Sequence, residues 1–231
     1  MQTRRRLIIA IDGPSGAGKG TVARAVALAL DYRHVDTGGM YRAVAWKAQR
    51  DGVDLADEDA VAEIARSATF ELAHGRVGID GHDVTAAIRT SEMDAAAASV
   101  ARLPNVRAAL VERQRAYGRE GGVVMEGRDI GTVVFPSADV KLFLDASPEE
   151  RARRRSQDPS HAAGRENTGV AVVAEALAAR DQSDRTRTAS PLARAEDALY
   201  IDTTSLSVEE VAARALEAVV ERQKLEGKSR K

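Results

Sequence analysis

Short apolar runs and amphipathic helical patterns alternate along most of this chain. Residues 7–11 form a continuous apolar run, typical of a strand buried on both faces. Apolar side chains then recur every three or four positions through residues 22–30, which is the spacing of one helix face. Four more extended runs follow, at 32–36, 121–129, 139–147 and 198–205. Five strand–helix units predict an α/β fold with a doubly wound parallel five-stranded sheet and helices on both faces.

The alternation is interrupted between residues 37 and 103. There, "FELAHGRVGIDGHDV" contains short extended pieces separated by His-Gly and Asp-Gly turn signals, with helical patterns on both sides. We therefore expect residues 37–103 to form an inserted lobe with a small antiparallel sheet. The remaining core would comprise residues 1–36, 104–150 and 190–231. Residues 151–189 would form a lid, and we expect its polar stretch at 156–169 to be a mobile loop.

Composition and charge exclude several classes of protein. The 231 residues carry a net charge of -1, so the basic excess of a general nucleic-acid or membrane-surface binder is missing. The chain has no cysteine, and its four histidines are too scattered to predict a metal site. The apolar run near the N-terminus is too short for a signal peptide and soon meets Asp12. We expect a cytoplasmic monomer without nucleic-acid or membrane partners.

The stretch "GPSGAGKGT" has the character of a phosphate-binding loop. It follows a predicted strand and precedes a predicted helix, the context in which backbone N–H groups and the helix N-terminus can cradle an anion. Lys19 would reach the β- and γ-phosphates. The usual Ser or Thr after the lysine is replaced by Gly20, and the hydroxyl comes one place later on Thr21. We therefore expect Mg²⁺ to depend on phosphates and waters and to arrive with the nucleotide.

Charged side chains gather near the predicted ends of the other strands, where parallel sheets bind their ligands. In "DTGGMYR", Arg42 can grip a phosphate through two hydrogen bonds, although a capped helix with a solvated arginine would look the same. "MEGRDIGT" could form either a structural ion pair or a recognition site. The basic run "RDQSDRTR" can be a solvated face, or it can neutralise a phosphoryl group in transfer.

Taken together, these motifs resemble bacterial cytidylate kinases, which are nucleoside monophosphate kinases of the P-loop class. The resemblance runs nearly end to end and rests on "GPSGAGKGT", "DTGGMYRAVAW", "IRTSE", "EGRDIGTVVFPSADVKLFLDASPEERARRR", "RDQSDRTRT" and "SPLARAEDALYIDTTSLSVEEV". It implies transfer of the γ-phosphoryl group of ATP to CMP or dCMP, with Mg²⁺.

The resemblance also implies roles for individual residues. The ATP-binding residues would be Gly13, Pro14, Ser15, Gly16, Ala17, Gly18, Lys19, Gly20, Thr21 and Arg154. The acceptor-binding residues would be Asp36, Thr37, Tyr41, Arg42, Arg89, Arg107, Arg128, Asp129, Arg180, Asp184 and Arg187. Catalysis would involve Lys19, Arg128, Arg180 and Arg187. Asp129 would accept a hydrogen bond from the cytosine amino group, a pairing that suits a carboxylate, and Asp184 would contact the ribose.

Some positions depart from the family or stay open. The family often has Ser contacting cytosine where this chain has Ala98, so either Ser99 replaces it through a slight helix rotation or the contact is missing. Many members have Asp in place of Glu126, whose role stays open. Arg153 and Arg155 can be merely solvated. The alternatives for function are another P-loop nucleotide or small-metabolite kinase, or a GTP-dependent regulatory switch, although the guanine-selecting Asn-Lys-x-Asp motif is missing.

Overall fold

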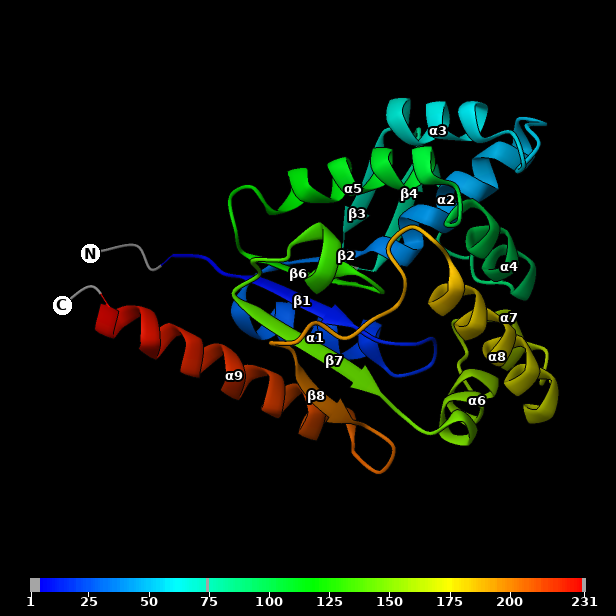
Figure 1. The fold of residues 1–231 in the computed structure, drawn as a ribbon. Coiled ribbons are helices and arrows are strands. Elements are labelled where there is room, and N and C mark those ends of the chain that lie inside the picture. Colours follow the sequence, from blue (N-terminus) through cyan, green and yellow to red (C-terminus); the bar gives the residue numbers. More distant parts are fainter. Residues whose placement is uncertain (1–4, 74, 230–231) are drawn as a thin grey trace.

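A five-stranded parallel sheet lies at the centre of the molecule (Figure 1). The structure is a computed structural model and describes residues 5–73 and 75–229. The sheet has the order β2-β6-β1-β7-β8. The strands are β1 (Ile8–Asp12), β2 (Arg33–Asp36), β6 (Val123–Gly127), β7 (Val140–Asp145) and β8 (Leu199–Asp202). The fold predicted from the alternating pattern is therefore confirmed.

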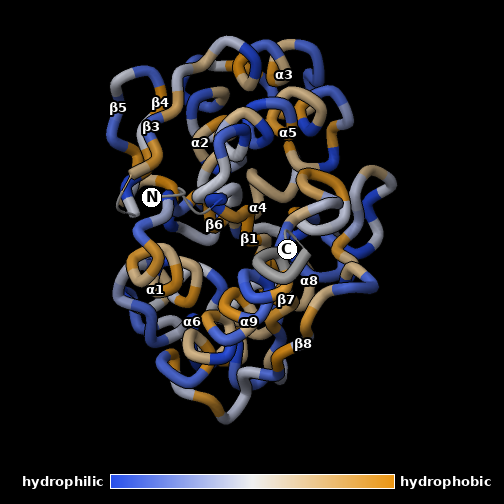
Figure 2. The backbone as a smooth tube through the Cα atoms, turned by 90° about the vertical axis from the view of Figure 1, so that its left-hand side faces the viewer, coloured by the Kyte–Doolittle hydropathy of each residue, from blue (hydrophilic) through white to orange (hydrophobic). Residues whose placement is uncertain are grey.

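The two faces of this sheet are covered by different helices. Along β1, Ile9 and Ile11 face one side and pack against α1 (Lys19–Leu30) and α9 (Val208–Ser229). Ala10 faces the other side and joins a cluster that includes α2 (Thr37–Arg50) and α5 (Pro104–Gly118). This division follows from the two-residue period of a strand. In Figure 2 the chain is hydrophobic where it passes through the central strands and mixed along the surrounding helices.

The expected small sheet is also present. It consists of β3 (Phe70–Ala73), β4 (Arg76–Ile79) and β5 (His82–Asp83), paired antiparallel. Asp80 and Gly81, both with positive φ, form the predicted Asp-Gly turn between β4 and β5. In the predicted His-Gly turn, His74 lies outside the described residues.

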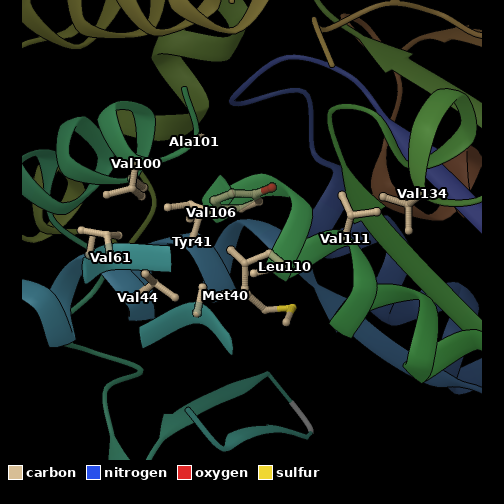
Figure 3. Close-up of a cluster of buried hydrophobic side chains, with 14 of the residues drawn as sticks. Met40, Tyr41, Val44, Val61, Val100, Ala101, Val106, Leu110, Val111 and Val134 are labelled. Carbon is tan, nitrogen blue, oxygen red and sulfur yellow. The ribbon is translucent and has the colours of Figure 1, made fainter. Parts of the chain in front are cut away.

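The inserted segment shares its hydrophobic core with the main sheet. Helices α3 (Glu58–Ser67) and α4 (Ser91–Val100) bury Val61 and Val100 in the same cluster as Val44 of α2 and Leu110 of α5 (Figure 3). Helix α5, which we had placed in the main core, therefore packs directly on the inserted segment. The position and orientation of α4 are consequently coupled to the central sheet through continuous packing.

The segment predicted as a lid contains three helices, α6 (Pro148–Ser156), α7 (Ala162–Arg165) and α8 (Val170–Thr186). They share a small apolar cluster of their own, which includes Ala152, Ala163 and Leu177. The polar stretch expected to be an irregular loop thus holds the short helix α7. Sequence patterns also gave no sign of the π-helix η1 (Ile130–Val134) that follows β6. No helix in the described part of the chain is long and apolar enough to cross a membrane.

Candidate active site

A cavity of about 530 Å³ lies at the carboxyl ends of the central strands. That is where parallel sheets place their ligands, and the volume is in the range of small-molecule sites. Every residue predicted for the site from Ser15 onward lines it. Gly13 and Pro14 are not among the residues that line it, and their contribution is to the shape of the loop.

The phosphate loop has a conformation that only glycine allows at key points. Gly13 has a φ of 145°, and a Cβ there would lie 1.9 Å from the carbonyl oxygen of Leu144. Gly18 has a φ of 86° and begins α1. Lys19 is buried, and its Nζ donates a hydrogen bond to the carbonyl of Pro14 at 2.7 Å. The loop is thus curled around the lysine, with its backbone facing the cavity.

Two buried charges beside the loop have displaced pKa values. Burial, with a contribution from Arg128, lowers the pKa of Lys19 to about 7. Burial raises the pKa of Asp12 to about 6. The hydrogen bonds that its carboxylate accepts from the amides of Ile130 and Gly131 lower this pKa, but by less than burial raises it. Asp12 therefore fixes the start of η1, and η1 follows the predicted recognition motif directly.

Around the start of α2, the predicted residues are tied to one another. Asp36 caps the helix by accepting from the amide of Gly39 at 2.8 Å, and Arg42 donates to the same carboxylate at 3.1 Å. Burial alone would raise the pKa of Asp36. The charge of Arg42 and the hydrogen bond from the amide of Gly39 have the larger combined effect, so the pKa of Asp36 is below its usual value. Thr37 donates to the carbonyl of Glu126 at 2.7 Å. Asp36 and Thr37 thus hold the helix that presents Arg42.

A chain of alternating charges crosses the floor of the cavity. Arg107 forms a buried ion pair with Asp129, and Nη2 of Arg187 lies 3.8 Å from the other oxygen of Asp129. Arg187 also contacts Asp184 at 3.4 Å, and Nε of Arg128 donates to Asp184 at 2.8 Å. Residues from α5, the start of η1 and α8 are thereby brought together. Such pairing fixes the guanidinium groups in place before any substrate binds.

Tyr41 lies under this chain of charges. The Arg107 guanidinium sits 5.5 Å from the centre of its ring, a cation–π contact. Burial raises the pKa of Tyr41 to about 12, so the phenol stays protonated at neutral pH. Its aromatic face and the Arg107–Asp129 pair form one end of the cavity.

The arginines of α6 differ from one another. Arg154 lines the cavity and donates to the hydroxyl and carbonyl of Thr203. Arg155, which could have been merely solvated, instead lines the cavity with Nη2 3.2 Å from the hydroxyl of Ser15. Arg153 is paired with Glu150, and its side chain is more than half exposed. Arg151 is buried against Asp181 and the carbonyl of Ser15, which ties α6 and α8 to the phosphate loop.

Sequence reasoning missed two cavity features. Asp94 of α4 contacts Arg42, Arg180 and His161. The only signal was an acidic residue in an alanine-rich helix, with a second acidic residue, Glu92, two positions before it, and nothing in the pattern distinguished the two. The second is a contact between His34 and Glu126, with Nε2 and Oε1 2.9 Å apart. The partnership could not be inferred because the two residues are 92 positions apart.

The sequence left two alternatives: either Ser99 replaces the serine that the family has at position 98, or that contact is missing. In the structure, Ser99 does not line the cavity. Ser99 is exposed, and its hydroxyl donates to the carbonyl of Ala95 at 3.2 Å, within its own helix. The α4 residues that line the cavity include Ala97 but neither Ala98 nor Ser99. The cavity therefore gains no serine hydroxyl from this part of α4.

Comparison with known proteins adds the following. Residues 9–221 match the family model described as cytidylate kinase. A cytidylate kinase from Bacillus subtilis (strain 168) is 48% identical over 93% of this chain and 97% of its own length. One from Pelotomaculum thermopropionicum is 52% identical over 88% of this chain and 91% of its own length. In fold, the chain is similar to a gluconokinase from Sinorhizobium meliloti 1021, with a TM-score of 0.53 at 16% identity, covering 98% of this chain and 99% of that one.

Proposed function

The chain belongs to the cytidylate kinase family, and from that premise we propose that it transfers the γ-phosphoryl group of ATP to CMP or dCMP, giving ADP and CDP or dCDP. The observation that carries the proposal is the single cavity that joins a phosphate loop to a set of arginines and to the buried Asp129. A donor phosphate and a cytosine acceptor can therefore occupy one enclosure.

We place ATP on the phosphate loop. The backbone amides of residues 15–21 and the N-terminus of α1 would bind its phosphates, and Lys19 would add a positive charge. The hydrogen bond from Lys19 to Pro14 holds the lysine over the loop. Arg154 and Arg155 lie on the lid side of the same space and would contact the donor from there.

We place the acceptor at the opposite end. Arg42, Arg128, Arg180 and Arg187 line that part of the cavity and would bind the acceptor phosphate. Asp129, oriented by Arg107, would accept a hydrogen bond from the exocyclic amino group of cytosine. Asp184 would contact the ribose, and Arg89 lies at the edge of the cavity within reach of the acceptor side.

Mg²⁺ would enter with ATP, and the donors near Lys19 fit it. The cavity offers the carboxylate of Glu126 and the hydroxyl of Thr21, and oxygen is the ligand that Mg²⁺ prefers. Gly20 brings no hydroxyl, so the ion would depend mainly on phosphate oxygens and waters, and these two side chains would contact it directly or through water. The ion supplies neutralisation of phosphate charge when it is bound.

The chain's own residues then act mainly by positioning and by charge. The attacking group is a phosphate oxygen of CMP, which needs no general base. In the transfer, this oxygen forms a bond to the γ-phosphorus while the bond from that phosphorus to the β,γ-bridging oxygen of ATP breaks, and ADP leaves. The arginines would stabilise the charge on the group in transfer. The lid helices would exclude water, which otherwise competes as the acceptor.

A coupled assay of ADP formation tests the proposal. With ATP and Mg²⁺ fixed, CMP and dCMP should support turnover at least about tenfold faster than AMP, GMP or UMP, as expected for a site built around one base edge. Equal rates with all five acceptors would contradict the assignment. We expect the enzyme to act as a monomer, because every proposed site residue comes from one chain, and in the cytoplasm, where its substrates occur.

A further inference from the structure

Asp94 of α4 lies where four helices meet. Its Oδ1 is 2.8 Å from Nη1 of Arg180 on α8 and 3.5 Å from Nη1 of Arg42 on α2. Its Oδ2 is 3.3 Å from Nε2 of His161, which begins α7. The Asp94 side chain is only 17% exposed. One carboxylate thus connects the inserted segment, the lid and the acceptor end of the cavity.

The two arginines keep donors free for an anion. Arg180 uses a single nitrogen, Nη1, for both the side chain and the backbone carbonyl of Asp94. The Nε atoms of Arg42 and Arg180 are buried and have no hydrogen-bond partner within the described part of the chain. Unpaired buried donors are costly, and they mark a place where a ligand can supply the missing acceptor.

The charge balance explains why a carboxylate is needed at this point. Arg42, Arg155, Arg180 and His161 all surround Asp94, and the arginines would repel one another without it. Burial raises the pKa of Asp94, but the close contact with His161 and the charges of Arg180 and Arg42 outweigh it and hold that pKa well below its usual range. The carboxylate is therefore ionised at neutral pH.

His161 is fixed in the orientation that this contact requires. Its Nδ1 accepts a hydrogen bond from the amide of Ala163 at 3.1 Å. In a neutral ring the proton must then be on Nε2, which points at Asp94. Next to it, the amide of Ala162 donates to the carbonyl of Arg89 at 2.9 Å. The lid is thereby attached to the inserted segment by two neighbouring contacts, and Figure 1 shows the lid helices next to α4.

From this arrangement we propose that Asp94 is a positioning residue: it orients Arg42 and Arg180 toward the acceptor phosphate and, through His161, holds the lid against the inserted segment. This proposal rests on the proposed function for the identity of the acceptor. The contact between lid and inserted segment does not depend on it.

Asp94→Asn tests both parts, because it keeps the shape and removes the charge. The KM for CMP should rise about tenfold, while the KM for ATP stays within about twofold, because the two arginines paired directly with Asp94, Arg42 and Arg180, lie on the acceptor side. Amide hydrogen exchange in residues 157–169, measured without nucleotide, should become several-fold faster. Glu92→Gln is the matched control: Glu92 lies in the same first turn of α4, is exposed, and should change neither measurement.

Further variants separate the outcomes. His161→Ala should speed exchange in the lid as much as Asp94→Asn, and the double variant should add little, because both remove one contact. His161→Ala should affect the KM for CMP less, because Arg42 and Arg180 keep their carboxylate. Tighter CMP binding in Asp94→Asn would overturn the proposal, since Asp94 would then be competing with the phosphate. Unchanged exchange would overturn the lid contact. If the wild type fails to phosphorylate CMP, the proposed function fails, and the exchange experiment still decides the contact.

Discussion

Gly20 lies directly against the carboxylate of Glu126. A Cβ added at position 20 would sit 3.0 Å from Oε1 and 3.4 Å from Oε2 of that side chain. The same Oε1 is 2.9 Å from Nε2 of His34, so the carboxylate is held on its other side. This contact gives a physical reason for the glycine after Lys19, where phosphate loops usually carry a hydroxyl residue. Glu126 occupies the space that a serine or threonine side chain at position 20 would need.

Gly20→Ala should therefore have an effect that depends on Glu126. In a helix, alanine is more favourable than glycine by about 1 kcal/mol. In the wild-type background the crowding should cancel or exceed this gain, since overpacking costs about 1 to 3 kcal/mol. In a Glu126→Asp background, with a shorter side chain, the same change should stabilise the protein. Urea unfolding of the four proteins measures this coupling. If Gly20→Ala has the same effect in both backgrounds, the two side chains are not in contact.

The pKa of Lys19 predicts a pH-dependent stability. It is lowered to about 7 in the folded protein from an ordinary value of 10.5. Between these values the unfolded chain binds a proton that the folded protein has lost, so stability rises with pH through this window. Below about pH 7 the burial cost of the charged lysine is fully present.

The variant Lys19→Met lacks the pH-dependent contribution of Lys19 to the free energy of unfolding. The free energy of unfolding of the wild type, relative to Lys19→Met, should rise by about 2 kcal/mol between pH 7 and pH 9, at about 1.4 kcal/mol per unit of pKa shift. Denaturant unfolding at both pH values gives the free energy of unfolding of each protein. Subtracting the value of the variant from that of the wild type cancels the contributions of the titrating groups that both proteins contain. A constant difference would mean that the pKa of Lys19 is not lowered.

Arg128→Ala should separate catalysis from donor binding. Arg128 is paired with Asp184 at 2.8 Å at the acceptor end of the cavity. Its loss should reduce kcat by about 10²-fold or more, as for other groups that stabilise charge in the transition state. The Kd for ATP, measured by calorimetry, should change little. Arg66→Ala is the control, because Arg66 does not line the cavity, is exposed and is paired with Glu63 at 3.1 Å. Equal loss of ATP binding and turnover in Arg128→Ala would refute the assigned role.

Much of the fold follows from local patterns. The apolar run at 7–11 and the strand end at Asp36 were visible because a buried parallel strand needs consecutive apolar residues and terminates at polar ones. The π-helix at Ile130–Val134 was not visible. Its start depends on amide hydrogen bonds to Asp12, about 120 residues earlier, and no local pattern encodes such a contact.

The candidate site, like the fold, can be predicted only in part from local sequence patterns. Glycine spacing and Lys19 are local features, and the structure has them between β1 and α1. The partner of each charged side chain is set by the tertiary fold. Asp94 meets Arg180 across 86 positions, and His34 meets Glu126 across 92. Arg155 had the same sequence signal as Arg153, and only the packing of α6 against the phosphate loop distinguishes the partly buried side chain of Arg155 from the exposed one of Arg153.

Asp129→Asn should alter the choice of base. The Asp129 carboxylate is buried beside Arg107 and can only accept hydrogen bonds, which suits the amino group of cytosine and opposes the carbonyl of uracil. Asparagine can also donate, so the ratio of kcat/KM for CMP to that for UMP should fall about ten- to a hundredfold, the usual discrimination of one base contact. Asp184→Asn is the control: at the ribose it should weaken both acceptors alike and leave the ratio unchanged. If Asp129→Asn lowers both activities in parallel, Asp129 acts only by holding Arg107, and the base must be read by another group.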